Sequence, residues 1–167
     1  MTAMNTNDQD AHLDLDHWLK ENVSKFLVFA RQCTRSEQDA EDVLQEALVE
    51  SWKLSNGKPD ISLVFSKIRQ RSIDLGRRMN TRSILEDKYA SEADTIWFET
   101  ELESSEKMDI LKDSLKNLPE EQRLILTLKI WGEQTFAEIA STLKIPQGTV
   151  ASRYRLALAT LQKTINK

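Results

Sequence analysis

The stretch Thr135–Leu161, TFAEIASTLKIPQGTVASRYRLALATL, has the pattern of two short helices joined by a tight turn. Thr135 is a favourable N-cap, and Glu138 three residues later completes a capping box. The turn follows at residues 144–145, and Pro146 begins the second helix, where its missing N–H has no partner to lose. The stretch therefore predicts a helix-turn-helix, although a plain helical hairpin would give the same pattern.

The second helix of this stretch has an apolar face and a polar face. Its apolar positions recur at helical spacing and predict a buried stripe of Val150, Tyr154, Ala157, Leu158 and Leu161. The polar face carries Gln147, Thr149, Ser152, Arg153 and Arg155. Amides, hydroxyls and guanidinium groups bind phosphates and base edges, and the N-terminal end of such a helix is the part that enters the major groove. We therefore expect this face to bind DNA.

Composition indicates an all-α protein. The 167 residues include only four glycines and three prolines, and strand-like alternation is nearly absent. The length suits one domain or two small ones. Cys33 is the single cysteine, so the chain suits a reducing cytoplasm, and we expect this residue to fill a small space in the core. No apolar run approaches the length of a membrane span, and the acidic N-terminus is unlike a signal peptide, so we expect a cytoplasmic protein without membrane contact of its own.

The charges are arranged in blocks, although the net charge is −4. Residues 67–82 carry six basic side chains and one acid, and residues 144–167 carry five basic side chains and no acid. Residues 37–50 carry six acids and no basic side chain, and residues 86–113 carry ten acids against three lysines. Basic blocks attract a polyanion, whereas acidic blocks repel DNA and suit a basic protein partner.

The first acidic block falls on a helix predicted over Glu37–Leu54 and capped by Ser36. Its apolar spacing predicts a buried stripe of Ala40, Val43, Leu44, Ala47, Leu48 and Trp52. The carboxylates outside that stripe have no Lys or Arg partner within the block, so the helix forgoes the usual i,i+4 pairs. They form either a solvated face or a docking surface for a basic partner.

The other predicted helices flank this acidic one. One helix is predicted over Leu13–Gln32, after a polar segment from Met1 to about Ala11 that we expect to be disordered. Another is predicted over Ile61–Met79 and carries most of the first basic block, after a loop at Ser55–Pro59. Apolar residues expected in the cores of these helices include Val23 and Ile73. The acidic segment that follows is the predicted linker, which we expect to cover the DNA-binding faces of a compact free chain.

Together these residues resemble the small two-domain bacterial sigma factors of the extracytoplasmic-function (ECF) group. The segment from Asp39 to Ala47, DAEDVLQEA, with Trp52 behind it, is similar to the first-domain motif of that family. LKNLPEEQRLIL, AEIASTL and IP-x-GTV-x-SR are similar to its second domain, and both motifs occur in the family's order. The resemblance implies an all-α chain with a region 2-like domain at 12–82, an acidic linker at 83–106 and a region 4-like helix-turn-helix domain at 107–167.

The resemblance also implies a function and a role for each surface. The chain would be an alternative sigma factor that binds core RNA polymerase and directs promoter recognition and opening. Asp39, Asp42, Gln45 and Glu46 would bind the polymerase clamp. The −10 promoter element would contact Asn56, Lys58, Arg69, Gln70, Asp74, Arg77 and Arg78. The −35 element would contact Gln147, Thr149, Ser152, Arg153 and Arg155. An anti-sigma factor would be a further partner, and no metal, cofactor or catalytic residue is implied.

Several positions depart from the pattern of the family. Gln70 stands where many members have Asn, and Arg71 stands where an apolar residue is common. Ala151 and Leu156 replace frequent basic residues in the second helix of the helix-turn-helix. These changes predict weaker DNA affinity that depends more strongly on polymerase.

Three other functions are alternatives to the sigma factor. A stand-alone, dimeric helix-turn-helix regulator would explain the C-terminal half but leaves the acidic helix unexplained. An adaptor could use the acidic faces to bind a regulator instead of polymerase. An enzyme fits poorly, because the only histidines, His12 and His17, accompany no nucleophile, metal-ligand cluster or Gly-rich phosphate loop.

Overall fold

The computed structural model describes residues 6–83 and 113–165. Its elements are α1 (Thr6–Cys33), α2 (Glu37–Leu54), α3 (Ile61–Ser83), α5 (Glu120–Leu126), the π-helix η1 (Thr127–Trp131), α6 (Phe136–Leu143) and α7 (Gln147–Ile165). Residues 113–116 are also helical, and these two described ranges contain no strand. The all-α prediction is confirmed. The expected linker role of residues 83–106 falls almost wholly outside the described residues.

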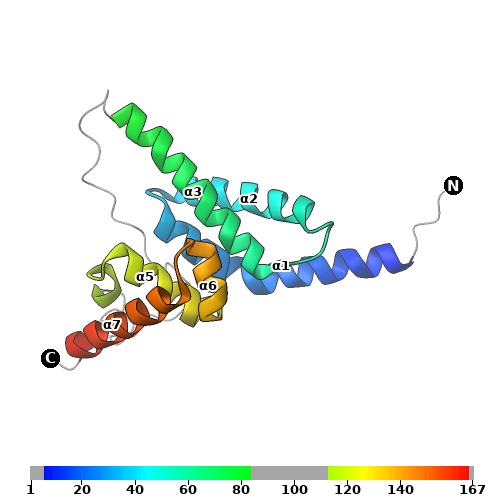
Figure 1. Cartoon of the computed structure of the whole chain (residues 1–167). Coiled ribbons are helices and arrows are strands. Elements are labelled where there is room, and N and C mark those ends of the chain that lie inside the picture. The colour runs from blue at the N-terminus through cyan, green and yellow to red at the C-terminus, as the bar shows by residue number, and fades with distance from the viewer. Residues whose placement is uncertain (1–5, 84–112, 166–167) are drawn as a thin grey trace.

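The first three helices form one packed unit (Figure 1). The observed bounds of α2 are those predicted, and the Ser36 hydroxyl accepts a hydrogen bond from the Asp39 N–H at 3.1 Å, as expected of an N-cap. The prediction of disorder up to about Ala11 is wrong for residues 6–11, because α1 already begins at Thr6. These first turns extend beyond the body of the molecule in Figure 1.

The C-terminal part builds the predicted helix-turn-helix from α6 and α7. Thr135 and Glu138 form the expected capping box, with both reciprocal hydrogen bonds present. Lys144 ends α6 in the left-handed conformation at φ 57°, which turns the chain toward Pro146. The Pro146 carbonyl then accepts hydrogen bonds from the N–H groups of Thr149 and Val150 at the start of α7.

The main hydrophobic core joins the two halves of the chain. Phe65 of α3 is 1% exposed and makes edge-on ring contacts with Phe26 and Phe29 of α1, at centroid distances of 5.1 and 5.4 Å. The same buried cluster includes residues from the C-terminal half: Leu124, Ile125, Leu128, Ile139 and Val150. The described parts of the two predicted domains therefore share one core.

Polar contacts surround this shared core where α3 meets α6. The Ser62 hydroxyl lies 2.7 Å from Gln134 Oε1 and 2.5 Å from Glu138 Oε2. Arg69 lies on another part of α3, with its Nη1 3.7 Å from Glu120 Oε1. The contact between the halves thus combines apolar burial with hydrogen bonds and an ion pair, as a stable interface requires.

Some apolar residues expected in the core lie at the surface. Val23, Trp52, Ile73 and Leu158 are 37–40% exposed. Each has the right helical period but lies at the edge of its buried stripe, where the neighbouring helix no longer covers it. A helix long and apolar enough to cross a membrane does not occur in the described parts of the chain.

Candidate functional site

The predicted polymerase-docking residues lie on the outer side of α2. Asp42, Gln45 and Glu46 are exposed, and Asp39 is partly buried in the first turn. The opposite side of the helix is buried, including Ala40, Val43, Leu44 and Ala47, which packs it onto its neighbours. The amphipathic pattern of α2 therefore holds the helix by its apolar stripe and leaves these polar groups accessible.

Three of the α2 carboxylates, Glu37, Glu46 and Glu50, have basic partners on other helices, although the block itself contains no Lys or Arg. Glu37 Oε1 lies 2.6 Å from Arg31 Nη2 on α1. Glu50 Oε2 lies 2.7 Å from Arg71 Nη2 on α3, and Glu46 Oε2 lies 3.9 Å from Nη1 of the same arginine. The partners come from other helices, so a count of charges along α2 could not find them.

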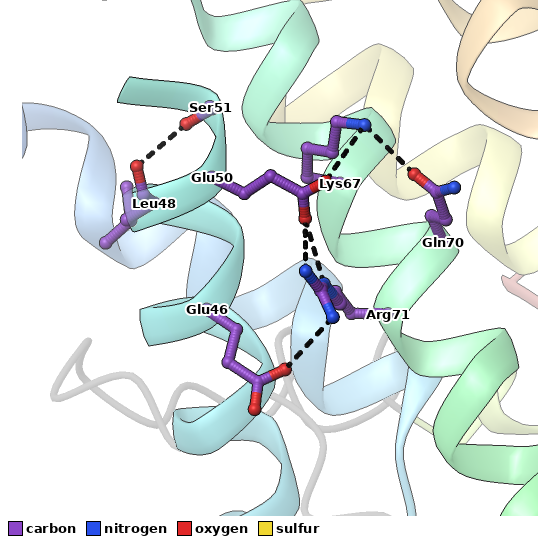
Figure 2. Close-up of polar contacts among 7 residues, drawn as sticks. All are labelled: Glu46, Leu48, Glu50, Ser51, Lys67, Gln70 and Arg71. Atoms are coloured by element: carbon purple, nitrogen blue, oxygen red, sulfur yellow. Dashed lines mark hydrogen bonds and ion pairs between the residues drawn. The ribbon is translucent and has the colours of Figure 1, made fainter. Parts of the chain in front are cut away.

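Figure 2 shows how these charges connect α2 with α3. Arg71 donates to Glu50 through Nε as well, at 2.9 Å, while Lys67 Nζ lies 3.4 Å from the other Glu50 oxygen. The hydrogen bond from Arg71 and the charge of Lys67 hold the pKa of Glu50 below its usual value. The same hydrogen bond raises the pKa of Arg71. Both side chains are therefore charged at neutral pH.

Three of the docking residues and part of the predicted −10 surface line the same groove. It is lined on α2 by Asp39, Asp42 and Glu46, and on α3 by Arg71, Asp74 and Arg78, among others. Residues 71, 74 and 78 follow the i, i+3, i+7 spacing, which keeps them on one face of the helix. Two surfaces predicted for different partners thus adjoin each other, an arrangement that sequence spacing alone did not reveal.

The remaining residues of the predicted −10 set are more dispersed. Asn56 and Lys58 are exposed in the loop before α3, where Asn56 adopts the left-handed conformation at φ 55°. Gln70 and Arg77 are exposed on α3. Arg69 instead points toward the C-terminal half and its ion pair with Glu120, so these residues do not form a single continuous face.

An apolar pocket lies beside the same loop. Its lining includes Trp18 and Leu19 of α1, Leu48 and Trp52 of α2, and Pro59 of the loop. The partial exposure of Trp52 follows from this position. The loop and the aromatic residues meet here because α1 packs against the end of α2, a contact that local spacing does not determine.

The predicted −35 residues begin at the N-terminal end of α7. Gln147, Ser152 and Arg155 are exposed, while Thr149 is partly buried. Arg153 Nη2 lies 3.2 Å from Glu121 Oε2 on α5, an ion pair that the sequence reasoning missed. Val150 and Ala157 are buried on the other side of α7, as predicted. The helix therefore presents amide, hydroxyl and guanidinium groups on its outer face.

The metal-ligating and thiol side chains of the described residues lie apart from one another. Among residues 6–83 and 113–165, no group of His, Cys, Asp or Glu could hold a metal ion. Desolvation of the Cys33 thiol raises its pKa to about 12, so the thiol is protonated at neutral pH. His17 pairs with Glu21 at 2.9 Å on the exposed side of α1.

Comparison with known proteins identifies relatives over most of the chain. The family described as Sigma-70, region 4 matches residues 108–161. The RNA polymerase sigma-E factor of Streptomyces avermitilis is 26% identical over 92% of this chain and 86% of its own length. ECF sigma factor SigL of Mycobacterium tuberculosis is 26% identical over 83% of this chain and 81% of its own. ECF sigma factor SigW of Bacillus subtilis is also 26% identical, over 95% and 90%.

The fold is similar to that of a solved sigma factor. The structure of RpoE from Bartonella quintana, in complex with the anti-sigma factor NepR, matches with a TM-score of 0.66. The match covers 92% of this chain and 97% of RpoE at 20% sequence identity. The sequence relatives, the matched helix-turn-helix region and the shared all-α fold agree in supporting an RNA polymerase sigma factor of the ECF group.

Proposed function

We propose that this chain directs transcription initiation as a sigma factor through three contacts. Helix α2 docks on core RNA polymerase, α3 and the loop before it contact the −10 element, and α7 contacts the −35 element. In domain terms, residues 12–82 form the region 2-like unit, 83–106 the linker and 107–167 the region 4-like unit. We also propose an anti-sigma partner, as RpoE has in NepR, and a cytoplasmic location. Sigma factors are not enzymes in general, and binding is the only activity proposed.

The observation that carries this proposal is the outer side of α2. Asp42 and Glu46 are exposed there, directly opposite the buried stripe that holds the helix in place. Exposed carboxylates at fixed positions attract a basic partner and steer its approach. The 61% exposure of the Glu46 side chain supports this role, because its weak contact with Arg71 leaves it accessible.

The proposed DNA contacts have two different roles in recognition. Arg155, Ser152 and Gln147 are exposed on α7 and carry the donors and acceptors that phosphates and base edges require. Asn56 and Lys58 in the loop before α3, and Gln70 further along that helix, offer similar groups. Contact with DNA backbone would set the register, whereas contacts with base edges would set the preferred promoter sequence.

The test is a binding assay with core RNA polymerase, followed by mapping of transcripts initiated in vitro. We expect the wild-type chain to bind core and to start transcription at a narrow set of sites. Asp42→Arg combined with Glu46→Arg should lower core affinity at least about a hundredfold, since buried interface charges of the wrong sign cost several kcal/mol.

A matched control makes the same change of charge elsewhere. Asp16→Arg with Glu21→Arg alters two exposed acids of α1, which pair only with neighbours on that helix among the described contacts. Core binding should survive in this control. If the wild-type chain does not bind core polymerase but binds DNA tightly as a dimer, the result contradicts the proposal and favours a stand-alone regulator.

A further inference from the structure

A chain of charged and polar contacts runs from the docking face of α2 to the DNA-facing part of α3. Arg71 contacts Glu46 at 3.9 Å and Glu50 at 2.7 Å. Lys67 contacts the second oxygen of Glu50 at 3.4 Å and donates to Gln70 Oε1 at 3.1 Å. All five side chains appear in Figure 2, with Arg71 turned toward the α2 carboxylates.

This arrangement gives Arg71 two conflicting partners in the proposed initiation complex. Its guanidinium now lies against Glu46 and Glu50, on the helix proposed to dock on polymerase. Its backbone lies on α3, within one turn of Gln70 and Asp74 in the proposed −10 surface. A basic polymerase side chain at Glu46 would compete with Arg71 for the carboxylate and repel its charge. Promoter phosphates would supply a new anion nearby.

The present contacts are open enough to solvent for such an exchange. The side chains of Arg71 and Glu50 are 38% and 30% exposed, so water and salt screen their attraction. The pair is only partly buried, so a promoter phosphate can replace the carboxylate as the anion that Arg71 contacts. Glu50 would also retain Lys67 after Arg71 moves, so no carboxylate is left buried without a cation.

We propose that Arg71 changes partners during initiation: it pairs with Glu46 and Glu50 in the free protein and with a promoter phosphate once polymerase occupies the α2 face. This inference rests on the proposed function and adds a link between its two binding surfaces. Because coupling between two binding sites is reciprocal, polymerase raises DNA affinity through Arg71, and DNA raises polymerase affinity to the same extent.

The proposal predicts opposite effects for two substitutions in the same ion pair. Glu50→Gln is nearly isosteric and removes the charge that restrains Arg71, so the free protein should bind DNA more tightly. Arg71→Leu should bind DNA no better than wild type, and its core affinity should rise about twofold to fivefold, because the carboxylates lose an internal competitor of exposed-ion-pair strength. If the only role of Arg71 were to hold α2 against α3, both substitutions would weaken the binding of DNA and of core polymerase.

The decisive measurement uses the free full-length protein and a fluorescent single-stranded DNA of arbitrary sequence, since a phosphate contact does not depend on sequence. Affinity is measured over a range of salt concentrations. Glu50→Gln should steepen the slope of log affinity against log salt by about 0.7, the value of one added phosphate contact. The double variant Glu50→Gln/Arg71→Leu should return to the wild-type slope.

Glu37→Gln is the matched control, because it removes a carboxylate from the same helix and from a comparable arginine pair, with Arg31 at 2.6 Å. Its slope should equal that of wild type. A steeper slope that persists in the double variant would assign the phosphate contact to Lys67 and overturn the proposal. An unchanged slope in Glu50→Gln would overturn it as well. Core binding by wild type tests the proposed function separately, since the DNA titration contains no polymerase.

Discussion

The two sides of α3 are held by different forces. Toward α2, part of the contact consists of partly exposed ion pairs, in which Arg71 and Lys67 share Glu50. Toward α6 and η1, Phe65 and Ile68 are fully buried in a core that includes the C-terminal half. Ion pairs at a surface exchange partners at little cost, whereas separating an apolar contact exposes it to water. One side of the helix is therefore suited to exchange and the other to holding the two halves together.

The difference has a consequence for promoter binding. Among the described residues, part of α3 is covered by α6, and Arg69 is engaged by Glu120. If the −10 and −35 surfaces must separate to reach their promoter elements, the apolar contact is the one that has to open. Polymerase would supply that free energy by binding the separated form more tightly than the closed one.

Removing the Phe65 ring from the apolar side of α3 should have the largest effect on stability. Phe65→Ala deletes a ring that contacts Phe26 and Phe29, and we expect the free energy of unfolding to fall by about 3–5 kcal/mol. Urea denaturation followed by circular dichroism measures this change. Ile73→Ala is the control, because Ile73 lies on the same helix but is 37% exposed, so its loss should be much smaller. Equal losses in the two variants would contradict the central position given to Phe65.

Adding a methyl group at the same contact should have a smaller effect. A Cβ on Gly132 would lie 2.7 Å from the Leu128 carbonyl oxygen and 3.1 Å from Phe65 Cζ. Gly132→Ala therefore crowds the η1 backbone at Leu128 as well as the Phe65 ring of α3, and it should cost about 1–3 kcal/mol of stability, as overpacking does. Gly76→Ala is the matched control, since a Cβ there meets no atom within 4 Å, and it should be neutral or slightly stabilising in its helix.

The sequence predicted the individual helices better than their contacts. Periodicity and capping residues located α2 at Glu37–Leu54 and the cap at Thr135 because these signals lie within a few residues of one another. The Arg71–Glu50 pair joins residues 21 positions apart, and the Ser62–Glu138 contact joins residues 76 positions apart. Such contacts depend on how helices pack, which local spacing does not determine. The docking residues were found through a motif, whereas their proximity to Arg71 required the structure.

The smallest expected effect is a change in how stability depends on pH. It separates the two sides of α3, because Glu138 on one side and Glu50 on the other have different kinds of partner. Hydrogen bonds from the Ser62 hydroxyl and the Thr135 backbone lower the pKa of Glu138. Because the folded pKa lies below the unfolded value near 4.5, the ionised group stabilises the fold above that pH, and this stabilisation is lost as pH falls through the folded pKa. Glu138→Gln should cost about 1 kcal/mol at neutral pH and flatten the acid limb of the stability curve.

Glu50→Gln provides the comparison for that measurement, because the Glu50 pKa is also lowered, but by cations. Salt screens a cation–carboxylate pair more than it screens hydrogen bonds from neutral donors. Raising the salt concentration should therefore shrink the difference between wild type and Glu50→Gln more than the difference between wild type and Glu138→Gln. Urea denaturation between about pH 3 and pH 7 at low and high salt measures both differences. If salt shrinks the two stability differences equally, charge does not distinguish the α2 side of α3 from its α6 side.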